Sequence, residues 1–426
     1  MTARCARITS PGLALGALTF LNVLNYADRY VGAAVLPLML ADLSLTDAQG
    51  GVLQSVFVLS YSLVSPITGW LGDRYRRLTL AAAGVAVWSL ATVGSGLAPG
   101  YGSLLLARAI TGVGEASYAV VTPSLIADLY PAERRGRMLA VFYAAIPVGT
   151  ALGYVAGGAV GAAWGWRAAF LMAGLPGAML AFGLLAVREP RRGAFDAPSA
   201  GRTALGLGPS LAGLATRRSY TFNTVAQIGY TFVLGGLAAW MPTYFVRERS
   251  LGLATATTTF GAVLLLAGFA GTLLGGFLGD RLTRHRPAGH FLVSGAGLVI
   301  STVFTTVAVL SPDPTVYWSA MFLTLVLVFL NIGPLNAAMA NVLPPDLRAR
   351  GFAVSTMAIH LLGDAASPWL IGEASDTLGL KIPVLVTGLL LGASGLVLLA
   401  GMKALERDLR ADQSRLPIPP RRDVSC

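Results

Sequence analysis

Two adjacent ionisable residues, Asp28 and Arg29, lie near the middle of an apolar run that extends over residues 12–40. An ionised side chain at the centre of a bilayer costs at least ~2.5 kcal/mol on insertion scales, and such residues normally take part in function. Because successive residues of a helix point about 100° apart, the two side chains should reach different neighbours. We expect one of them to face a cavity and the other to face a packing interface.

A second apolar run, residues 102–127, supplies an acid and a base at helical spacing. Arg108, Glu115 and Tyr118 fall on one face of the predicted helix. The protonation of a buried carboxyl group depends on its burial and on the distance to a neighbouring guanidinium. We therefore predict that Glu115, assisted by Asp28, exchanges protons. A static ion pair that holds the two spans together is the alternative interpretation.

Arg29 and Arg108 are candidate ligands for an anionic group, because a guanidinium matches the geometry of phosphate and carboxylate. The second half of the chain is poorer in ionisable residues, although His360 precedes Asp364 by one helical turn. A binding cavity would be ionic toward the first half and apolar and aromatic toward the second, which suits an amphiphile. The predicted substrate-binding residues are Arg29, Arg108, Glu115, Tyr118, Gln227, Tyr230 and His360.

The hexapeptide Gly-x-Leu-Gly-Asp-Arg occurs twice, at residues 69–74 and 276–281, each time at the end of an apolar run. The chain is therefore internally duplicated, a property of secondary transporters whose substrate site lies between two repeats. The charges around the first copy suit a latch that forms in one conformation and breaks in another, with a plain loop anchor as the alternative. The predicted latch residues are Asp73, Arg74, Arg77 and Asp128.

The elements that must position these residues are apolar runs of about 20 residues, the length of a membrane-spanning helix. Hydrophobic residues make up 55% of the 426 positions and charged residues 12%, with a mean hydropathy of +0.67. The predicted spans are 12–40, 48–71, 78–97, 102–127, 136–163, 167–187, 220–247, 254–282, 289–310, 314–341, 350–378 and 382–404.

These runs predict an all-α membrane protein with 12 transmembrane helices in two six-helix halves. We expect an N-terminal bundle over residues 1–187 and a C-terminal bundle over residues 220–404. An Arg- and Gly-rich linker at 188–219 joins them, and a polar, Pro-rich tail follows at 405–426.

The net charge of +11 is explained by membrane topology. Of the 31 Lys and Arg residues, 25 fall in the two tails, the linker and the loops that would lie on the same side. Positive residues stay cytoplasmic during insertion, so we expect both termini in the cytoplasm and no nucleic-acid partner.

Enzyme signatures are absent from the sequence. The chain has three His and two Cys, the latter at positions 5 and 426, and contains no Gly-rich loop that ends in Gly-Lys-Ser/Thr. We therefore expect no catalytic site, no metal and no cofactor.

These motifs together resemble the major facilitator superfamily, whose cytoplasmic motif matches Gly69, Leu71, Asp73, Arg74 and Arg77. The narrower resemblance is to the spinster family. It extends over almost the whole chain and rests on Asn25-Tyr26-x-Asp28-Arg29, residues 112–118 (Gly-Val-Gly-Glu-Ala-Ser-Tyr), residues 125–129, residues 142–149 and residues 360–368.

The resemblance implies a proton-coupled carrier of lysophospholipids or of sphingosine-1-phosphate-like lipids, with Asp28, Arg29, Arg108 and Glu115 in its charged site. Its partners would be the lipid, protons and the membrane, and we expect a monomer in a bacterial inner membrane. A drug/proton antiporter is the alternative, although Tyr154 stands where the antiporter pattern has Pro. A receptor that transports nothing is a further alternative.

Overall fold

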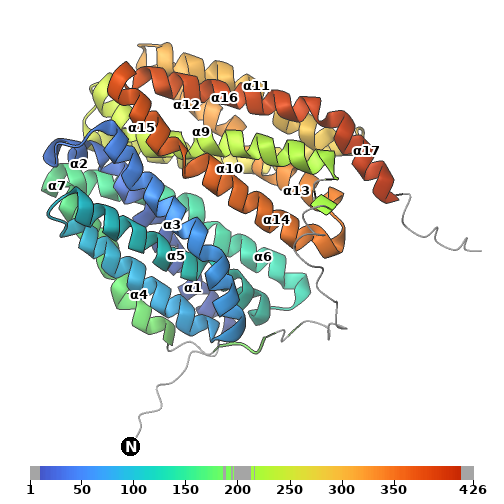
Figure 1. The fold of residues 1–426 in the computed structure, drawn as a ribbon, viewed down its shortest axis with the longest axis horizontal. Helices are drawn as coiled ribbons and strands as arrows, with labels where there is room; N and C mark the ends of the chain where they lie inside the picture. Colours follow the sequence, from blue (N-terminus) through green and yellow to red (C-terminus); the bar gives the residue numbers. More distant parts are fainter. Residues whose placement is uncertain (1–9, 186–188, 193–194, 196–212, 215, 414–426) are drawn as a thin grey trace, which may run out of the picture.

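The computed structural model describes residues 10–185, 189–192, 195, 213–214 and 216–413. These residues form helices joined by short turns and contain no β-strand. Nine helices in the described part of the chain are long and apolar enough to cross a membrane. Figure 1 shows them as two groups, with the helices of the first half below and those of the second half above.

The first half contains the helices up to the predicted linker. Pro11 and the capping box of Thr46 with Gln49 mark the starts of two of them, as expected for helix N-termini. The helices are α1 (Pro11–Ala34), α2 (Leu36–Asp42), α3 (Asp47–Arg74), α4 (Arg77–Gly96), α5 (Tyr101–Leu129), α6 (Ala132–Tyr143) and α7 (Ala145–Leu185).

The second half also contains long apolar helices, and in addition a short segment of π-helix, η1. Its helices are α9 (Arg218–Glu248), α10 (Leu253–Thr283), α11 (Gly289–Leu310), α12 (Pro314–Phe329), α13 (Ile332–Val342), α14 (Pro345–Ile359), η1 (His360–Asp364), α15 (Ser367–Leu378), α16 (Lys381–Ala400) and α17 (Met402–Gln413).

Helices occupy each of the twelve predicted runs, and within the described residues nine of the helical segments are long and apolar enough to span a membrane. The nine do not include α1, nor the interrupted helix from α14 through α15. The span counted at Arg134–Leu184 contains Gly165 at φ 84° and ψ 163°, a non-helical residue that separates two predicted runs. A left-handed φ of this kind favours Gly, which has no Cβ.

Two ends of the bundle are distinguished by their charges. We call the end that carries Arg74–Arg77, residues 134–137 and residues 281–286 the basic end, and the opposite end, with residues 42–47, 248–252 and 375–381, the far end. Asp47 at the start of α3 accepts hydrogen bonds from Arg247 at the end of α9, at 2.7 and 2.8 Å. The first and second halves are therefore tied together at the far end.

Further contacts between the halves lie along α3 and α7. The backbone N–H of Trp369 on α15 donates to the Ser55 hydroxyl on α3 (3.2 Å). The Tyr154 hydroxyl on α7 donates to the Ala238 carbonyl on α9 (2.5 Å). Tyr154 is fully buried. The residue that stands where the antiporter pattern has Pro therefore takes part in a hydrogen bond between the halves.

The structure describes only parts of the predicted linker and of the predicted C-terminal tail. Most of the linker at 188–219 lies outside the described residues, and α9 begins inside its predicted range, at Arg218. In the predicted tail at 405–426, helix α17 continues to Gln413. Leu405 is buried, and the Asp408 carboxylate accepts hydrogen bonds from the backbone and hydroxyl of Ser219, which holds this turn against α9.

Candidate functional site

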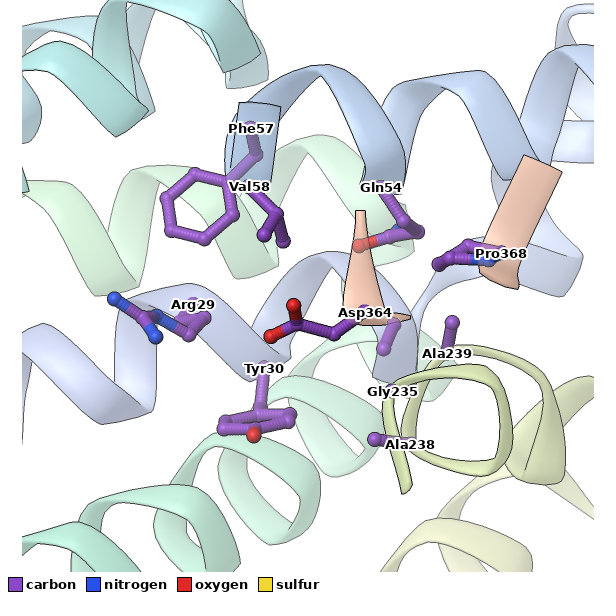
Figure 2. A pocket seen from close by; sticks show the side chains of 11 residues that line it. Arg29, Tyr30, Gln54, Phe57, Val58, Gly235, Ala238, Ala239, Asp364 and Pro368 are labelled. Carbon is purple, nitrogen blue, oxygen red and sulfur yellow. The ribbon is translucent and has the colours of Figure 1, made fainter. Parts of the chain in front are cut away.

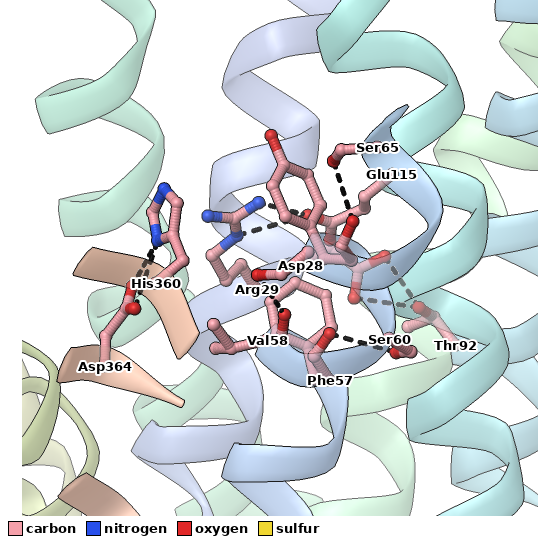
Figure 3. A network of polar contacts seen from close by, with 12 residues as sticks. Asp28, Arg29, Phe57, Val58, Ser60, Ser65, Thr92, Glu115, His360 and Asp364 are labelled. Atoms are coloured by element: carbon pink, nitrogen blue, oxygen red, sulfur yellow. Dashed lines mark hydrogen bonds and ion pairs between the residues drawn. The ribbon is translucent and has the colours of Figure 1, made fainter. Parts of the chain in front are cut away.

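Arg29 on α1 and Glu115 on α5 form a buried ion pair. Nε and Nη2 of Arg29 donate to the same oxygen, Oε2, at 3.1 and 2.8 Å. The Glu115 side chain is fully buried, whereas that of Arg29 is 20% exposed. Figure 3 shows Arg29 extending from α1 to meet Glu115. One edge of the guanidinium is thus hydrogen-bonded to the carboxylate, while part of the Arg29 side chain remains accessible.

The neighbouring acid, Asp28, points elsewhere. Its carboxylate lies 2.7 and 2.9 Å from the hydroxyl oxygen of Thr92 on α4, and it is 1% exposed. Adjacent positions on α1 therefore serve different neighbours: Arg29 reaches α5 and a cavity, whereas Asp28 lies in the packed interface with α4.

Arg108 on α5 is a buried cation with no hydrogen-bond partner for any of its three guanidinium nitrogens among the described residues. It is 2% exposed, and its charge is centred 4.9 Å from the ring of Phe57. Arg29 lies 5.0 Å from the same ring, so both guanidinium groups lie close to Phe57. Cation–π attraction offsets part of the cost of burying these charges, but Arg108 retains unused donors.

Arg108 and Gln54 both lie next to Gly32 on α1. A Cβ placed on Gly32 would lie in van der Waals contact with them, 3.4 Å from the Arg108 guanidinium carbon and 3.5 Å from Nε2 of Gln54. That Gln54 nitrogen also has no partner among the described residues. Two sets of unused donors therefore converge beside Gly32, next to the cavity.

A cavity of about 70 Å³ lies between the halves. Helices α1 and α3 line it from the first half, and α9, η1 and α15 from the second, as Figure 2 shows. Its wall combines a guanidinium and a carboxylate with apolar and aromatic groups. The lining residues are Arg29, Tyr30, Ala33, Gln54, Phe57, Val58, Gly235, Ala238, Ala239, Asp364 and Pro368.

The polar residues that the second half places near the cavity lie on η1. Nδ1 of His360 lies 3.1 and 3.0 Å from the two carboxylate oxygens of Asp364. The His360 ring meets the ring of Tyr61 on α3 edge-on, with centroids 6.3 Å apart. The π-helical turn is of a kind often found at functional sites, and here it places Asp364 on the cavity wall.

Of the seven predicted substrate-binding residues, Arg29 lines this cavity and the other six do not. Arg108, Glu115 and His360 lie close to its charged residues, whereas the remaining three are packed elsewhere. Tyr118 is fully buried, and its hydroxyl donates to the carbonyl of Leu18. Gln227 donates to Asn223 (2.7 Å), inside the second half. Tyr230 is 8% exposed within the same core. In this conformation, packing and internal hydrogen bonds account for Tyr118 and Gln227.

The predicted latch residues divide into a buried pair and an exposed pair. Nη2 of Arg77 lies 2.6 Å from Oδ2 of Asp128, and both side chains are less than one-tenth exposed. Glu189 accepts a hydrogen bond from the Arg77 backbone (2.9 Å). Arg74 stacks on the Trp70 ring at 3.8 Å, and the exposed Asp73 carboxylate makes no ion pair within the described part of the chain.

Sequence reasoning missed the partners that neutral side chains provide. Thr92, Gln54 and Phe57 carry no charge, so they did not stand out among apolar residues, yet each touches the charged site or its cavity. Of these three residues, Gln54 could have been recognised from the sequence, because an amide in the middle of an apolar span needs a hydrogen-bond partner.

The sequence model of the major facilitator superfamily matches residues 18–368. Protein spinster homolog 1 of Homo sapiens is 37% identical over 400 residues, which cover 87% of this chain and 75% of the human protein. This chain belongs to the spinster family of the major facilitator superfamily. A Danio rerio member, named a sphingosine-1-phosphate transporter, is 34% identical over 87% of this chain and 77% of its own length.

Solved structures of the superfamily share this fold. A bacterial homologue of the human lysosomal transporter spinster, inward-facing and unoccupied, superposes with a TM-score of 0.83 at 23% identity, covering 96% of this chain and 99% of the other. A D-xylose–proton symporter gives a TM-score of 0.73 at 17% identity, over 91% and 97% of the two chains. The spinster member described here is thus a multi-pass membrane protein with the transporter fold.

Proposed function

We propose that this spinster member is a proton-coupled secondary transporter of amphiphilic lipids, of the lysophospholipid or sphingosine-1-phosphate type, and not an enzyme. The observation that carries the proposal is the pairing of Arg29 with buried Glu115 at a cavity between the halves, close to Arg108, whose guanidinium has no hydrogen-bond partner among the described residues. A buried cation with free donors favours an anionic ligand.

Proton coupling is assigned to Glu115, with Asp28 assisting. An anionic headgroup that engages Arg29 would compete with Glu115 for the guanidinium, because Arg29 now gives two donors to one Glu115 oxygen. Loss of that partner leaves a buried carboxylate, which is strongly disfavoured unless it takes up a proton. Substrate binding and protonation are thereby linked through one side chain.

The lipid tail is assigned to the wall of the second half. Gly235, Ala238 and Ala239 on α9 present small apolar groups to the cavity. Such a wall discriminates weakly, at ~0.8 kcal/mol for each buried methylene, whereas polar groups left unpaired cost more. Headgroup selectivity therefore resides mainly in the charged residues.

Membrane orientation follows from the distribution of positive charge. With 25 of 31 basic residues on one side, the basic end faces the cytoplasm, both termini are cytoplasmic and the far end is outside. The composition suits a bacterial inner membrane, and the two-half site is complete within one chain, which supports a monomer.

The competing function is drug/proton antiport, since the superfamily includes such carriers and the span from Ala145 keeps Gly149, Gly153 and Gly157 at antiporter spacing. Purified protein in liposomes separates the two functions. We expect saturable uptake of a fluorescent lysophospholipid above protein-free vesicles and no comparable uptake of a cationic dye. Dye transport without lipid transport would support the antiporter, and transport of neither would support a receptor.

A further inference from the structure

Helices α3 and α15 meet at the far end through their backbones. A Cβ placed on Gly51 of α3 would lie 2.2 Å from the carbonyl oxygen of Pro368 and 2.7 Å from the Cα of Trp369. A Cβ placed on Gly372 of α15 would lie 2.2 Å from the carbonyl oxygen of Asp47. Real Cβ atoms essentially never come within 3.0 Å of another heavy atom in this way. The two helices therefore fit together because these two positions carry no side chain.

The atoms that an added methyl group would meet cannot rotate away. Both are main-chain carbonyl oxygens, of Pro368 and Asp47, within helices. The Pro368 carbonyl also accepts a hydrogen bond from Nε1 of Trp240 on α9 (2.9 Å), and Trp240 is fully buried. Trp240 would itself lie 2.9 Å from a Cβ on Gly372. Because α9 supports α15 from behind, such a clash is relieved by separating α3 from α15.

This contact closes one side of the cavity. Pro368 lines the cavity, and so does Gln54, which lies one helical turn after Gly51 on α3. Figure 2 shows both residues at the side of the cavity opposite Arg29. Separation of α3 from α15 would therefore open the cavity toward the far end.

An alanine at these positions would suit the helices themselves. Alanine is favoured over glycine in the interior of a helix, so the substitution supports each helix and disfavours the contact between the two. We propose that Gly51 and Gly372 form a backbone clasp that closes the far end of the cavity, and that one methyl group at either position holds the far end open. The clasp acts on the conformation of the empty protein and is independent of the substrate carried.

The test measures access to the cavity from outside and needs no lipid, so its outcome does not depend on the proposed function. Val58 lines the cavity, and Val58→Cys in a protein without its native Cys residues is labelled by an impermeant maleimide added outside. We expect Gly51→Ala and Gly372→Ala each to raise the labelling rate about tenfold, which corresponds to a bias of about 1.4 kcal/mol against the closed state. The double variant should be labelled no faster than either single variant if one methyl group already prevents closure.

Gly94→Ala on α4 is the matched control, because a Cβ there meets no atom within 4 Å among the described residues. It should keep the labelling rate of the parent protein. A folded Gly51→Ala protein that is labelled no faster than Gly94→Ala would overturn the proposal. If Gly51→Ala did not fold, Gly372→Ala would decide in the same way, since its methyl group meets the clasp from the opposite helix.

Discussion

The carboxylate of Asp376 in the second half caps the helix that begins at Asp47 in the first half. Its two oxygens accept hydrogen bonds from the backbone N–H groups of Asp47 (2.8 Å) and Ala48 (3.0 Å). The Asp47 carboxylate in turn accepts from Arg247 and from the hydroxyl of Ser375 (2.7 Å). Helix N-termini leave unpaired N–H groups that favour a negative charge, so separating the halves here would expose them.

We therefore predict that Asp376→Ala shifts the conformational equilibrium toward opening of the far end. Loss of a helix cap costs about 1 kcal/mol, and here the loss falls on the closed state alone. In a protein without its native Cys residues, Val58→Cys reports the opening through labelling by an impermeant maleimide added outside. Asp313→Ala is the matched control, because Asp313 caps α12 within a single half. Equal labelling in both variants would show that the Asp376 cap does not hold the far end closed.

Glu115→Gln should abolish uptake driven by a pH gradient while leaving exchange of substrate at least partly intact. Glutamine retains an oxygen that can accept from Arg29, but it cannot take up a proton at physiological pH. Driven uptake and counterflow are measured on the same vesicles. Glu373→Gln, at an exposed site on α15, serves as the control. Driven uptake equal to wild type would refute the role of Glu115.

The two arginines should respond differently to removal. Arg108 has no hydrogen-bond partner among the described residues, so Arg108→Met breaks no hydrogen bond and should leave the thermal stability of the empty protein unchanged or raise it, since a buried charge is costly to desolvate. Arg29→Met should lower stability, because it leaves Glu115 buried without its cation. Both variants should bind a phosphate-bearing lysolipid more weakly by about 1.5–3 kcal/mol.

Thermal-shift titration measures both effects in one experiment. A large loss of stability in Arg108→Met with unchanged lipid affinity would mean that this arginine has a structural role in the described helices and does not bind the headgroup.

At the basic end, Asp128→Asn should change turnover more than Asp73→Asn. The Asp128 carboxylate lies 2.6 Å from the Arg77 guanidinium in a nearly buried pair, and breaking such a pair by removing one partner costs about 3–5 kcal/mol. Both variants should keep near-normal lipid affinity, because neither residue lines the cavity. Initial rates of uptake report turnover, and binding constants report lipid affinity. A larger effect on turnover from Asp73→Asn would locate the latch at the exposed carboxylate instead.

The sequence predicted the helices and the charged centre better than it predicted the connections between the halves. Long apolar runs and the spacing of Asp28, Arg29, Arg108 and Glu115 depend on local periodicity, so their helices could be inferred directly. The Asp376–Asp47 and Tyr154–Ala238 contacts join residues far apart in the chain. No local pattern specifies such pairs, because they depend on how the two halves meet.

The charged residues of the candidate site could be picked out from the sequence, whereas their neutral neighbours could not. Tyr118 shares a helix face with Glu115, yet its hydroxyl bonds to Leu18 in the interior. A helix face identifies the direction of a side chain and leaves the identity of its neighbour open. Asp364 was recognised as one turn from His360, but no local pattern predicted the π-helical turn that contains it or its close approach to Gly235.

The central claim is that lipid and proton move in one coupled cycle through Arg29 and Glu115. Its most direct test records lysophospholipid uptake and internal pH together in proteoliposomes that contain wild-type or Glu115→Gln protein. We predict that adding lipid to wild type moves protons in proportion to lipid transported, and that Glu115→Gln exchanges lipid with no accompanying change of pH. Lipid uptake by wild type with no proton movement would contradict the account.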